Sequence, residues 1–218
     1  MPARRPPVRV LRGEGIQLAP LTPADFPALY LAIGHPEVFA GGYGGGLAGL
    51  PANETQFVEF AKGYFDLAAN NVYGVWRSDE VTTAGDRAEP NSARGAAGRL
   101  VGTSTLGDFD LANESSHIGW TAYDPALWGT AVNPETKLLM LGEAFDHGFG
   151  RVKLQADVLN SRSRAAMLKL GARFEGITRR ERPRADGTWR DTAVYSILAD
   201  EWPEVRAGLL ARLDRLGA

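Results

Sequence analysis

The sequence predicts an α plus β fold with mostly antiparallel strands, and three observations support this. Segments with strand-like alternation recur in both halves of the chain, and segments with a helical apolar face separate them. From residue 116 onward the segments follow the order strand, helix, strand, helix. Two further strands then flank ADGTW, a pentapeptide typical of a hairpin turn. The chain therefore combines hairpins with one strand–helix–strand–helix unit.

The first half begins with a short strand and two helices. Residues 16–20 alternate between apolar and polar or small side chains, which indicates a strand. Thr22 is a suitable N-cap for the next helix, with Pro23 at its first position. Residues 41–49 contain six glycines, which predicts a flexible or specially folded loop. Aromatic and apolar residues at helical spacing then predict a second helix at 54–69.

Three strand candidates follow, at 72–78, 99–109 and 116–123. The first two are separated by the 20 residues 79–98, in which Val81 is the only large apolar side chain. A loop of this length is normally functional or disordered. We predict a flexible insertion at 79–98, because the segment has little apolar surface to bury.

Two helices of the second half start directly after extended segments. Asn133 is predicted to be the N-cap of a long helix with Pro134 at its first position. A strand at 152–158 leads into a helix that Asn160 caps and Gly171 ends. The unpaired N–H groups and the positive end of a helix dipole suit a phosphate group. The sequence contains neither a Walker loop nor a dinucleotide-binding fingerprint.

Residues 203–218 are predicted to form an amphipathic helix with one apolar face, made of Val205, Leu209, Leu213 and Leu216. This face must pack against something, because isolated short helices are marginally stable in water. We expect it to dock either on the sheet or on a second copy of the chain in a homodimer.

Composition and charge indicate one soluble domain, at 14–202, and exclude several classes of protein. The 218 residues carry a net charge of −2, which gives no general attraction to nucleic acid or to an anionic membrane. The sequence has no cysteine, and its three histidines are scattered, so no metal site is expected. No apolar run is long enough to span a membrane. Residues 1–13 are basic, and we predict that they form a flexible arm. They lack the apolar stretch of a signal peptide, so we expect a cytoplasmic enzyme.

Two motifs carry a resemblance to a known family. DPALWGTAVNPETKLLMLGEAF at 124–145 and NSRSRAAMLKLGARFEG at 160–176 resemble the GCN5-related N-acetyltransferase (GNAT) family. They are most similar to its RimJ/RimL-like branch, and the likeness extends over about residues 15–202. The resemblance implies a mixed, splayed sheet with helices on both faces, and acetyl-CoA as cosubstrate. It also implies that acetyl-CoA lies between the splayed strands, with both helix starts at the mouth of its pocket.

The same resemblance implies the residues that bind acetyl-CoA. The family's pyrophosphate loop, Gln/Arg-x-x-Gly-x-Gly/Ala, aligns with Trp128, Ala131 and Asn133, so all three motif positions differ here. Backbone N–H groups could still hold the pyrophosphate. The later Asn-x-x-Ser…Leu-Gly pattern is preserved. The implied cofactor-binding residues are Trp128, Gly129, Thr130, Ala131, Val132, Asn133, Asn160, Arg162 and Ser163.

Each of these residues also has a purely structural interpretation. Asn133 and Asn160 could serve only as helix caps. Arg162 could belong to a solvated helix face, or it could contact a CoA phosphate. Trp128 could be part of the core or of the cleft wall. Capping alone does not explain why two such helix starts each follow an extended segment, as an acetyl-CoA cleft requires.

Two residues are implied to act in catalysis. RimJ/RimL-like proteins have Glu-Ile-Gly-Tyr/Trp on the strand before the loop, where this chain has His117-Ile118-Gly119-Trp120. His117 thus replaces a carboxylate that acts as general base in the family, and imidazole can fill that role. A structural or solvent-facing His117 is an equal alternative. Many relatives have a tyrosine where this chain has Met167, which leaves Ser163 as the hydroxyl suited to the CoA sulfur.

The predicted function is transfer of an acetyl group from acetyl-CoA to a primary amine by direct attack. The amine could be a protein N-terminus or a small molecule, and the sequence does not distinguish them. A module that binds acyl-CoA without turnover is the alternative, because the pyrophosphate loop is altered and the tyrosine is absent. A nucleotide-binding protein is disfavoured by the absence of phosphate-loop motifs.

Overall fold

The computed structural model describes residues 2–77 and 98–217. The insertion predicted at 79–98 therefore lies outside the described residues, apart from Gly98. The strands are β1 (Leu11–Arg12), β2 (Ile16–Pro20), β3 (Asn71–Arg77), β4 (Arg99–Asp110), β5 (Ser115–Tyr123), β6 (Arg151–Asp157), β7 (Arg173–Pro183) and β8 (Trp189–Leu198). The α-helices are α1 (Phe26–Ile33), α2 (Pro36–Ala40), α3 (Glu54–Tyr64), α4 (Val132–Asp146), α5 (Ser161–Lys169) and α6 (Trp202–Leu216).

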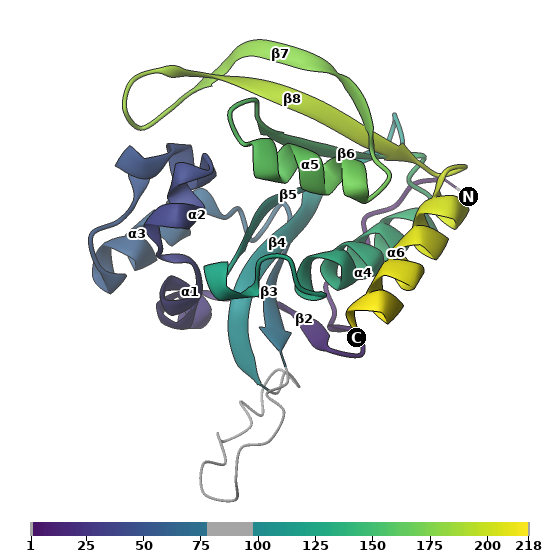
Figure 1. The fold of residues 1–218 in the computed structure, drawn as a ribbon, viewed down its shortest axis with the longest axis horizontal. Coiled ribbons are helices and arrows are strands. Elements are labelled where there is room, and N and C mark those ends of the chain that lie inside the picture. The colour runs from purple at the N-terminus through teal and green to yellow at the C-terminus, as the bar shows by residue number, and fades with distance from the viewer. Residues whose placement is uncertain (1, 78–97, 218) are drawn as a thin grey trace, which may run out of the picture.

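The strands form one eight-stranded sheet in the order β1-β2-β3-β4-β5-β6-β8-β7. Neighbouring strands run antiparallel, except β5 and β6, which are parallel and are joined through α4. This parallel pair is short, because only residues 115–117 of β5 face residues 151–153 of β6. The α+β fold with a splayed, mostly antiparallel sheet is thus confirmed (Figure 1).

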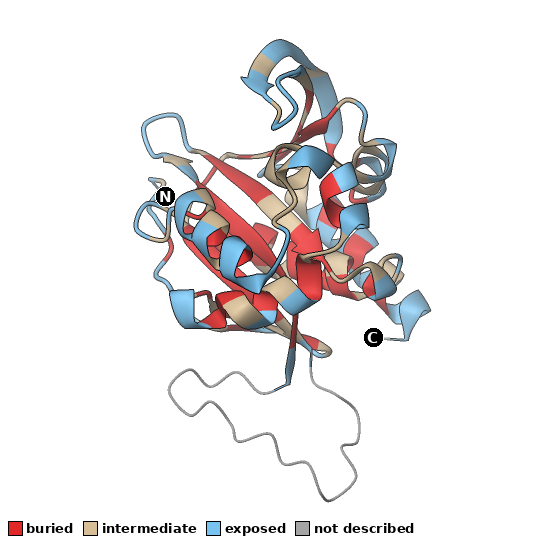
Figure 2. Cartoon of the chain, turned by 90° about the vertical axis from the view of Figure 1, so that its left-hand side faces the viewer, coloured by how far each residue is buried: buried red, intermediate tan, exposed pale blue. Residues whose placement is uncertain are grey.

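Helices cover both faces of the sheet and enclose two hydrophobic cores. Successive residues of a strand point to opposite faces, and both faces are buried here. Val72 and Leu100 therefore pack against α1–α3, whereas their neighbours Tyr73 and Val101 belong to the core beneath α4 and α6. Figure 2 shows the buried residues concentrated along the strands and on the inner sides of the helices. Helices on both faces are as predicted.

The N-terminal segment lies against the domain, which differs from the flexible arm that its composition predicts. The Arg5 side chain donates to the Asn71 amide oxygen at 3.1 Å, and Arg9 forms an ion pair with Glu143 at 2.7 Å. Leu11 is buried and pairs with Leu18 across β1 and β2. The physical reason is that Asn71 and Glu143 are buried polar groups, and such groups require partners.

The start of α4 also differs from the prediction. The helix begins at Val132 with Ala131 as the N-cap, so Asn133 and Pro134 lie inside the first turn. Pro134 is tolerated there because the first-turn N–H groups have no partner within the helix. The Asn133 side chain does not cap the helix and instead accepts a hydrogen bond from the Tyr123 hydroxyl at 3.2 Å. Asn133 therefore connects α4 to the end of β5.

The C-terminal helix α6 packs on the domain through the face that its sequence predicts. Val205, Leu209 and Leu213 are buried, and Val205 and Leu209 belong to the same core as α4. Leu216, which was predicted to share this face, is 43% exposed because it lies in the last turn. Within residues 2–77 and 98–217, no helix is both long and apolar enough to cross a membrane.

Candidate active site

A cavity of about 400 Å³ opens where β5 and β6 separate. Its walls come from β5 and β6, from α5 and the loop before α4, and from the glycine-rich loop after α2. Two features of β5 separate the strands. The pairing of β4 with β5 is irregular near Thr103–Thr105, and Trp120 has a positive φ of 49°. Such a bulge bends and twists a strand. The backbone of β5 beyond His117 therefore faces the cavity, with no ladder partner in β6.

His117 lies in the wall of this cavity and is held by a carboxylate. Its Nδ1 lies 2.9 Å from Oδ2 of Asp108, and its side chain is 3% exposed. A carboxylate only accepts hydrogen bonds, so Nδ1 carries the proton and the lone pair lies on Nε2. That Nε2 atom is buried and has no hydrogen-bond partner among the described residues. Burial lowers the pKa of His117, although the bond to Asp108 opposes this effect.

Gly119 leaves room for the imidazole. A Cβ atom at this position would approach the His117 ring to 2.5 Å, far inside van der Waals contact. The ring also lies 5.2 Å from the Trp120 ring, centroid to centroid. The His-Ile-Gly-Trp sequence thus packs His117 under its own strand.

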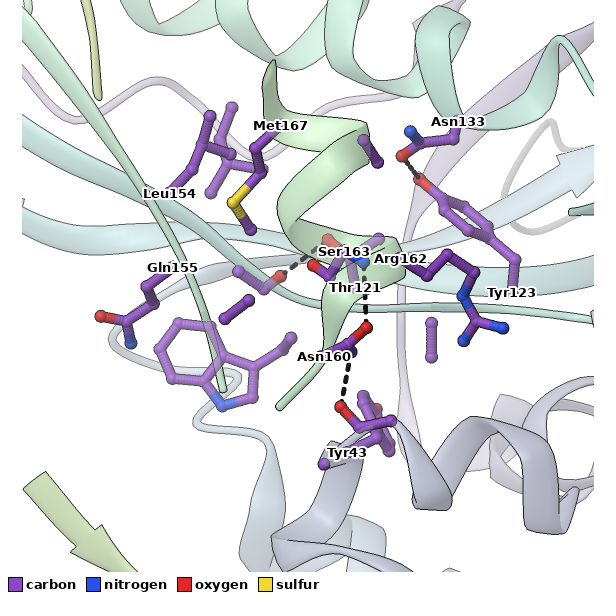
Figure 3. A pocket seen from close by; sticks show the side chains of 18 of the residues that line it. Tyr43, Thr121, Tyr123, Asn133, Leu154, Gln155, Asn160, Arg162, Ser163 and Met167 are labelled. Atoms are coloured by element: carbon purple, nitrogen blue, oxygen red, sulfur yellow. Dashed lines mark hydrogen bonds between the residues drawn. The ribbon is translucent and has the colours of Figure 1, made fainter. Parts of the chain in front are cut away.

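The start of α5 reaches the cavity through Asn160, Ser163 and Met167, which are spaced to share one helix face. Asn160 caps the helix as predicted, because its Oδ1 accepts from the Ser163 N–H at 2.9 Å. Its Nδ2 donates to the Gly41 carbonyl at 2.5 Å, which ties the glycine-rich loop to α5 (Figure 3). Figure 3 shows Ser163 and Met167 on the same side of the helix.

The loop before α4 forms the neighbouring wall. Trp128, Gly129, Thr130 and Asn133 line the cavity, whereas Ala131 and Val132 do not. Val132 instead packs in the core. The indole N–H of Trp128 donates to the Tyr123 carbonyl at 3.2 Å, and the Thr130 hydroxyl donates to the Leu127 carbonyl at 2.7 Å. These bonds fix the loop at the end of β5.

Arg162 connects the two helix starts. Its guanidinium carbon lies 3.2 Å from the centroid of the Trp128 ring, which is a stacked cation–π contact. Partial burial lowers the pKa of Arg162. A positive charge and the positive ends of two helix dipoles therefore meet at one mouth of the cavity, an arrangement suited to phosphate. Arg162 is thus exposed on α5, with its guanidinium group lying over Trp128.

Residues 16–173 match the sequence model of a protein family whose description is "Acetyltransferase (GNAT) domain". The chain belongs to the GNAT family of acetyltransferases. It is an acyl-CoA-dependent transferase of the RimJ/RimL-like branch, as the two motifs predict. No curated protein matches the chain in sequence at a significant level.

Several solved structures have the same fold. A GCN5-related N-acetyltransferase from Brucella melitensis is 24% identical, with a TM-score of 0.77 over 97% of this chain and 88% of that one. A protein from Chromobacterium violaceum, named a probable acetyltransferase of the GNAT family, is 25% identical, with a TM-score of 0.71 and coverage of 93% and 92%. RimJ from Mycobacterium smegmatis, in complex with CoA-disulfide, is 19% identical, with a TM-score of 0.59 and coverage of 94% and 92%.

Asp108 is a site residue that sequence reasoning missed. It lies at the register shift of β4 between Gly107 and Asp110 and has a positive φ of 48°. It lies beside His117 because Gly107 faces His117 across the β4–β5 hairpin. The interaction with His117 lowers the pKa of Asp108. A signal was available, because aspartate tolerates a left-handed backbone and the two strands join through a short turn. Pairing the hairpin from its turn outward would have placed Asp108 next to His117.

Lys137 is a second residue that sequence reasoning missed. It lies on α4, is 5% exposed, and donates to the hydroxyls of Thr121 at 2.8 Å and Ser104 at 3.2 Å. It has no carboxylate within ion-pair distance among the described residues, and burial lowers the pKa of Lys137 to about 7. The available signal was spacing, because Lys137 precedes Leu141 by four residues and so shares its buried face.

No cluster of three or more histidine, cysteine, aspartate or glutamate residues that could hold a metal ion occurs in the part of the chain that the structure describes. The groups gathered at the cavity are a histidine–aspartate pair, a buried lysine, hydroxyls and backbone amides. This set is able to move protons and to stabilise negative charge.

Proposed function

We propose that the protein transfers an acetyl group from acetyl-CoA to a primary amine by direct attack, with His117 as the general base. The observation that carries this proposal is the His117–Asp108 pair: His117 lines the cavity, and its buried Nε2 atom has no hydrogen-bond partner among the described residues. An amine must be neutral to attack, and with reference pKa values of ~7.8 for an α-amine and ~10.4 for lysine, most of it is protonated at pH 7. A well-placed base contributes ~10²–10⁴ in rate.

The residues at the mouth of the cavity fit acetyl-CoA. Arg162 on Trp128, together with the backbone N–H groups of Gly129, Asn133 and Arg162 at the cavity, would hold its phosphates and pantetheine. Bound acetyl-CoA would supply the acetyl group as an activated thioester. The backbone N–H groups around Trp120, where β5 leaves β6, are placed to stabilise negative charge on the carbonyl oxygen. The Ser163 hydroxyl would donate a hydrogen bond to the sulfur as CoA leaves as a thiolate.

Asp108 has the role of a positioning residue in this proposal. Its carboxylate keeps the proton on Nδ1 of His117 and so leaves Nε2 free to take the proton of the amine. It also stabilises the imidazolium once that proton has been taken. Lys153 lies 3.8 Å from the same carboxylate and balances its charge before the proton moves. The acceptor would be a protein N-terminus or a small-molecule amine.

The experiment is a steady-state assay of CoA release with a thiol reagent, over a panel of peptides and small amines. The chain has no cysteine, so the reagent reports only CoA. We expect His117→Gln to lower kcat/KM by about 10²-fold or more at pH 6–7, and by less at pH 9, where more of the amine is already neutral. Asp108→Asn should produce a smaller loss with the same pH trend.

Asp110→Asn is the matched control, because Asp110 lies on the same strand and its carboxylate accepts hydrogen bonds from Asn113 in the neighbouring turn. It should leave the pH profile unchanged. A His117→Gln profile that runs parallel to the wild-type profile would remove His117 from the mechanism. Binding of acetyl-CoA without turnover of any amine would instead support the alternative, a module that binds acyl-CoA without catalysis.

A further inference from the structure

Two arginines face each other across the β7–β8 hairpin. Arg182 is directly opposite Arg190 in the register, and both line the cavity. Like charges opposite each other on a sheet are destabilising. Burial, and secondarily Arg182, lower the pKa of Arg190. An arrangement of this kind is unfavourable in the free protein, and a bound negative group would relieve it.

Another arginine of the same hairpin, Arg184, has a full set of hydrogen-bond partners and serves as a comparison. Arg184 donates to both oxygens of Asp157 at 2.9 and 3.0 Å, and also to Thr188 and to the Trp189 carbonyl. Arg190 makes a single hydrogen bond, from Nε to the Thr192 hydroxyl at 2.9 Å. Among the described residues, no carboxylate lies within 4.0 Å of it.

Arg182 also has few protein partners. Its nearest carboxylate is that of the adjacent Glu181, at 3.6 Å, its side chain is 47% exposed, and that side chain makes no hydrogen bond to the described residues. A guanidinium group has five N–H donors in a planar fork. Most N–H donors of Arg182 and Arg190 therefore have no protein partner among the described residues, and a ligand in the cavity that both residues line could accept from them.

Carboxylates nearby do not cancel this positive charge. Six basic side chains line the cavity, namely Lys137, Arg162, Lys169, Arg182, Arg190 and Arg212. The carboxylate among the lining residues is that of Asp157, and Arg184 already pairs with it. The cavity therefore attracts a negatively charged group such as a carboxylate.

The arginine pair lies on the side of the cavity near the proposed base. Arg182 is close enough to Asp108 to contribute to the lowering of its pKa. Both arginines also act on Tyr64 of α3, opposing the rise in its pKa that burial causes. The proposed phosphate-binding residues belong instead to the starts of α4 and α5. An anion at the arginine pair would therefore lie beside the amine that His117 deprotonates.

A buried hydroxyl adds a further polar group to this wall. The Tyr43 hydroxyl is buried without a hydrogen-bond partner in the described residues, and Tyr43 lines the cavity. The glycine-rich loop that carries Tyr43 is joined to the hairpin, because the Ala185 N–H donates to the Gly45 carbonyl at 2.9 Å. An unpartnered buried hydroxyl is unfavourable unless a ligand or water satisfies it. A ligand with oxygen acceptors would do so.

We propose that Arg182 and Arg190 bind a carboxylate of the acceptor, so that the preferred substrates are primary amines with a carboxylate a few bonds from the amino group. This rests on the proposed function, which places the amine at His117. Free amino acids and peptides that begin with aspartate or glutamate share this chemistry. Arginine suits it because its fork binds both carboxylate oxygens.

The test compares matched acceptors in the CoA-release assay. One arm pairs free amino acids with their α-amides, and the other pairs peptides that begin with Asp or Glu with those that begin with Asn or Gln. In at least one arm, we expect wild-type kcat/KM to be about 10- to 100-fold higher for the carboxylate member, mainly through KM. The arm that shows the preference identifies the source of the carboxylate.

Arg182→Gln and Arg190→Lys should lower this preference about tenfold and leave the KM for acetyl-CoA and the turnover of the uncharged members within about twofold. Arg190→Lys keeps the charge of the half-buried site and removes only the fork, so folding is retained. Arg179→Gln is the control, because it removes a positive charge from the same strand at a position outside the cavity wall. It should leave the preference unchanged.

Equal turnover of both members in both arms would overturn the proposal, and so would a preference that survives Arg182→Gln and Arg190→Lys. An increased KM for acetyl-CoA would overturn it too, since the arginines would then serve the cosubstrate. If no amine releases CoA, the proposed function fails, and calorimetry on CoA-saturated protein tests the arginine site alone. The arginine site is supported if the acceptors with a carboxylate bind more tightly than their uncharged partners and Arg182→Gln abolishes this difference. Equal binding of both acceptors of a pair excludes the site.

Discussion

Replacing Lys137 with methionine should stabilise the protein at neutral pH. Lys137 is buried on α4 with two hydroxyls as its only hydrogen-bond partners in the described residues. Methionine has a similar volume and carries no charge, and replacing a buried charge by an apolar group of similar shape is often neutral or stabilising. The hydroxyls of Ser104 and Thr121 keep their mutual hydrogen bond of 2.8 Å, so neither becomes unsatisfied.

The magnitude follows from the protonation of Lys137. Its pKa falls from 10.5 in the unfolded chain to about 7 in the fold, because burial disfavours the ammonium. At ~1.4 kcal/mol per pKa unit, this shift opposes folding by up to ~4 kcal/mol at pH 7. We expect Lys137→Met to gain ~2–4 kcal/mol at that pH, with the lower end allowing for residual solvation of the ammonium.

The pH dependence gives the sharper test. Between pH 7 and 10.5 the unfolded chain binds one more proton at Lys137 than the folded chain does, so wild-type stability rises with pH. The stability of Lys137→Met lacks this contribution to the pH dependence. The difference between the two proteins should therefore shrink by up to ~1.4 kcal/mol per pH unit and vanish above pH 10.5.

The measurement is urea unfolding of both proteins, followed by tryptophan fluorescence at pH 7, 8, 9 and 10. Lys62→Met is the control, because Lys62 is an exposed lysine on α3 paired only with Glu59. Its effect should stay within ~0.5 kcal/mol at every pH. A Lys137→Met difference that is constant across this range, or a variant that is destabilised at pH 7, would refute the reasoning.

Three further predictions concern the helices around the site. Ser163→Ala should lower kcat with little change in acetyl-CoA affinity, because the hydroxyl acts only as charge develops on sulfur; a kcat/KM split in steady-state kinetics checks this. Asn160→Ala should lower the free energy of unfolding by ~1 kcal/mol, because the helix cap is lost; thermal or urea unfolding measures this. It should also raise the KM for acetyl-CoA, because the contact with Gly41 is lost. Leu209→Asp should lower the Tm measured by calorimetry by several degrees, because it places an unpaired carboxylate beneath α6. An unchanged Tm would show that the apolar face of α6 contributes no packing.

The features that were predictable from the sequence are those with local causes. The start of α5 follows from Asn160, whose side chain caps the N–H of Ser163 three residues later, and its end follows from Gly171, which has a positive φ. The β7–β8 hairpin follows from turn residues between two alternating segments. In each case the residues that give the signal lie within the element or its turn.

The errors have tertiary causes. The start of α4 was misplaced because Asn133 bonds to Tyr123, a residue of the preceding strand, instead of capping the helix. The N-terminal arm looked solvated because its acceptors, Asn71 and Glu143, are distant in sequence. Asp108 was missed for a related reason, because its importance arises only from the strand pairing that brings it to His117.

Three buried ionisable groups among the described residues illustrate two different consequences of burial. Glu143 lies away from the cavity and is satisfied by Arg9, so it anchors the N-terminal segment. His117 and Lys137 line the cavity, and each has a pKa lowered by burial. Lowered pKa values in a cleft are typical of groups that exchange protons, and their stability cost is retained where function requires it. A variant that relieves this cost at Lys137 should therefore separate stability from activity, becoming more stable without becoming a faster enzyme.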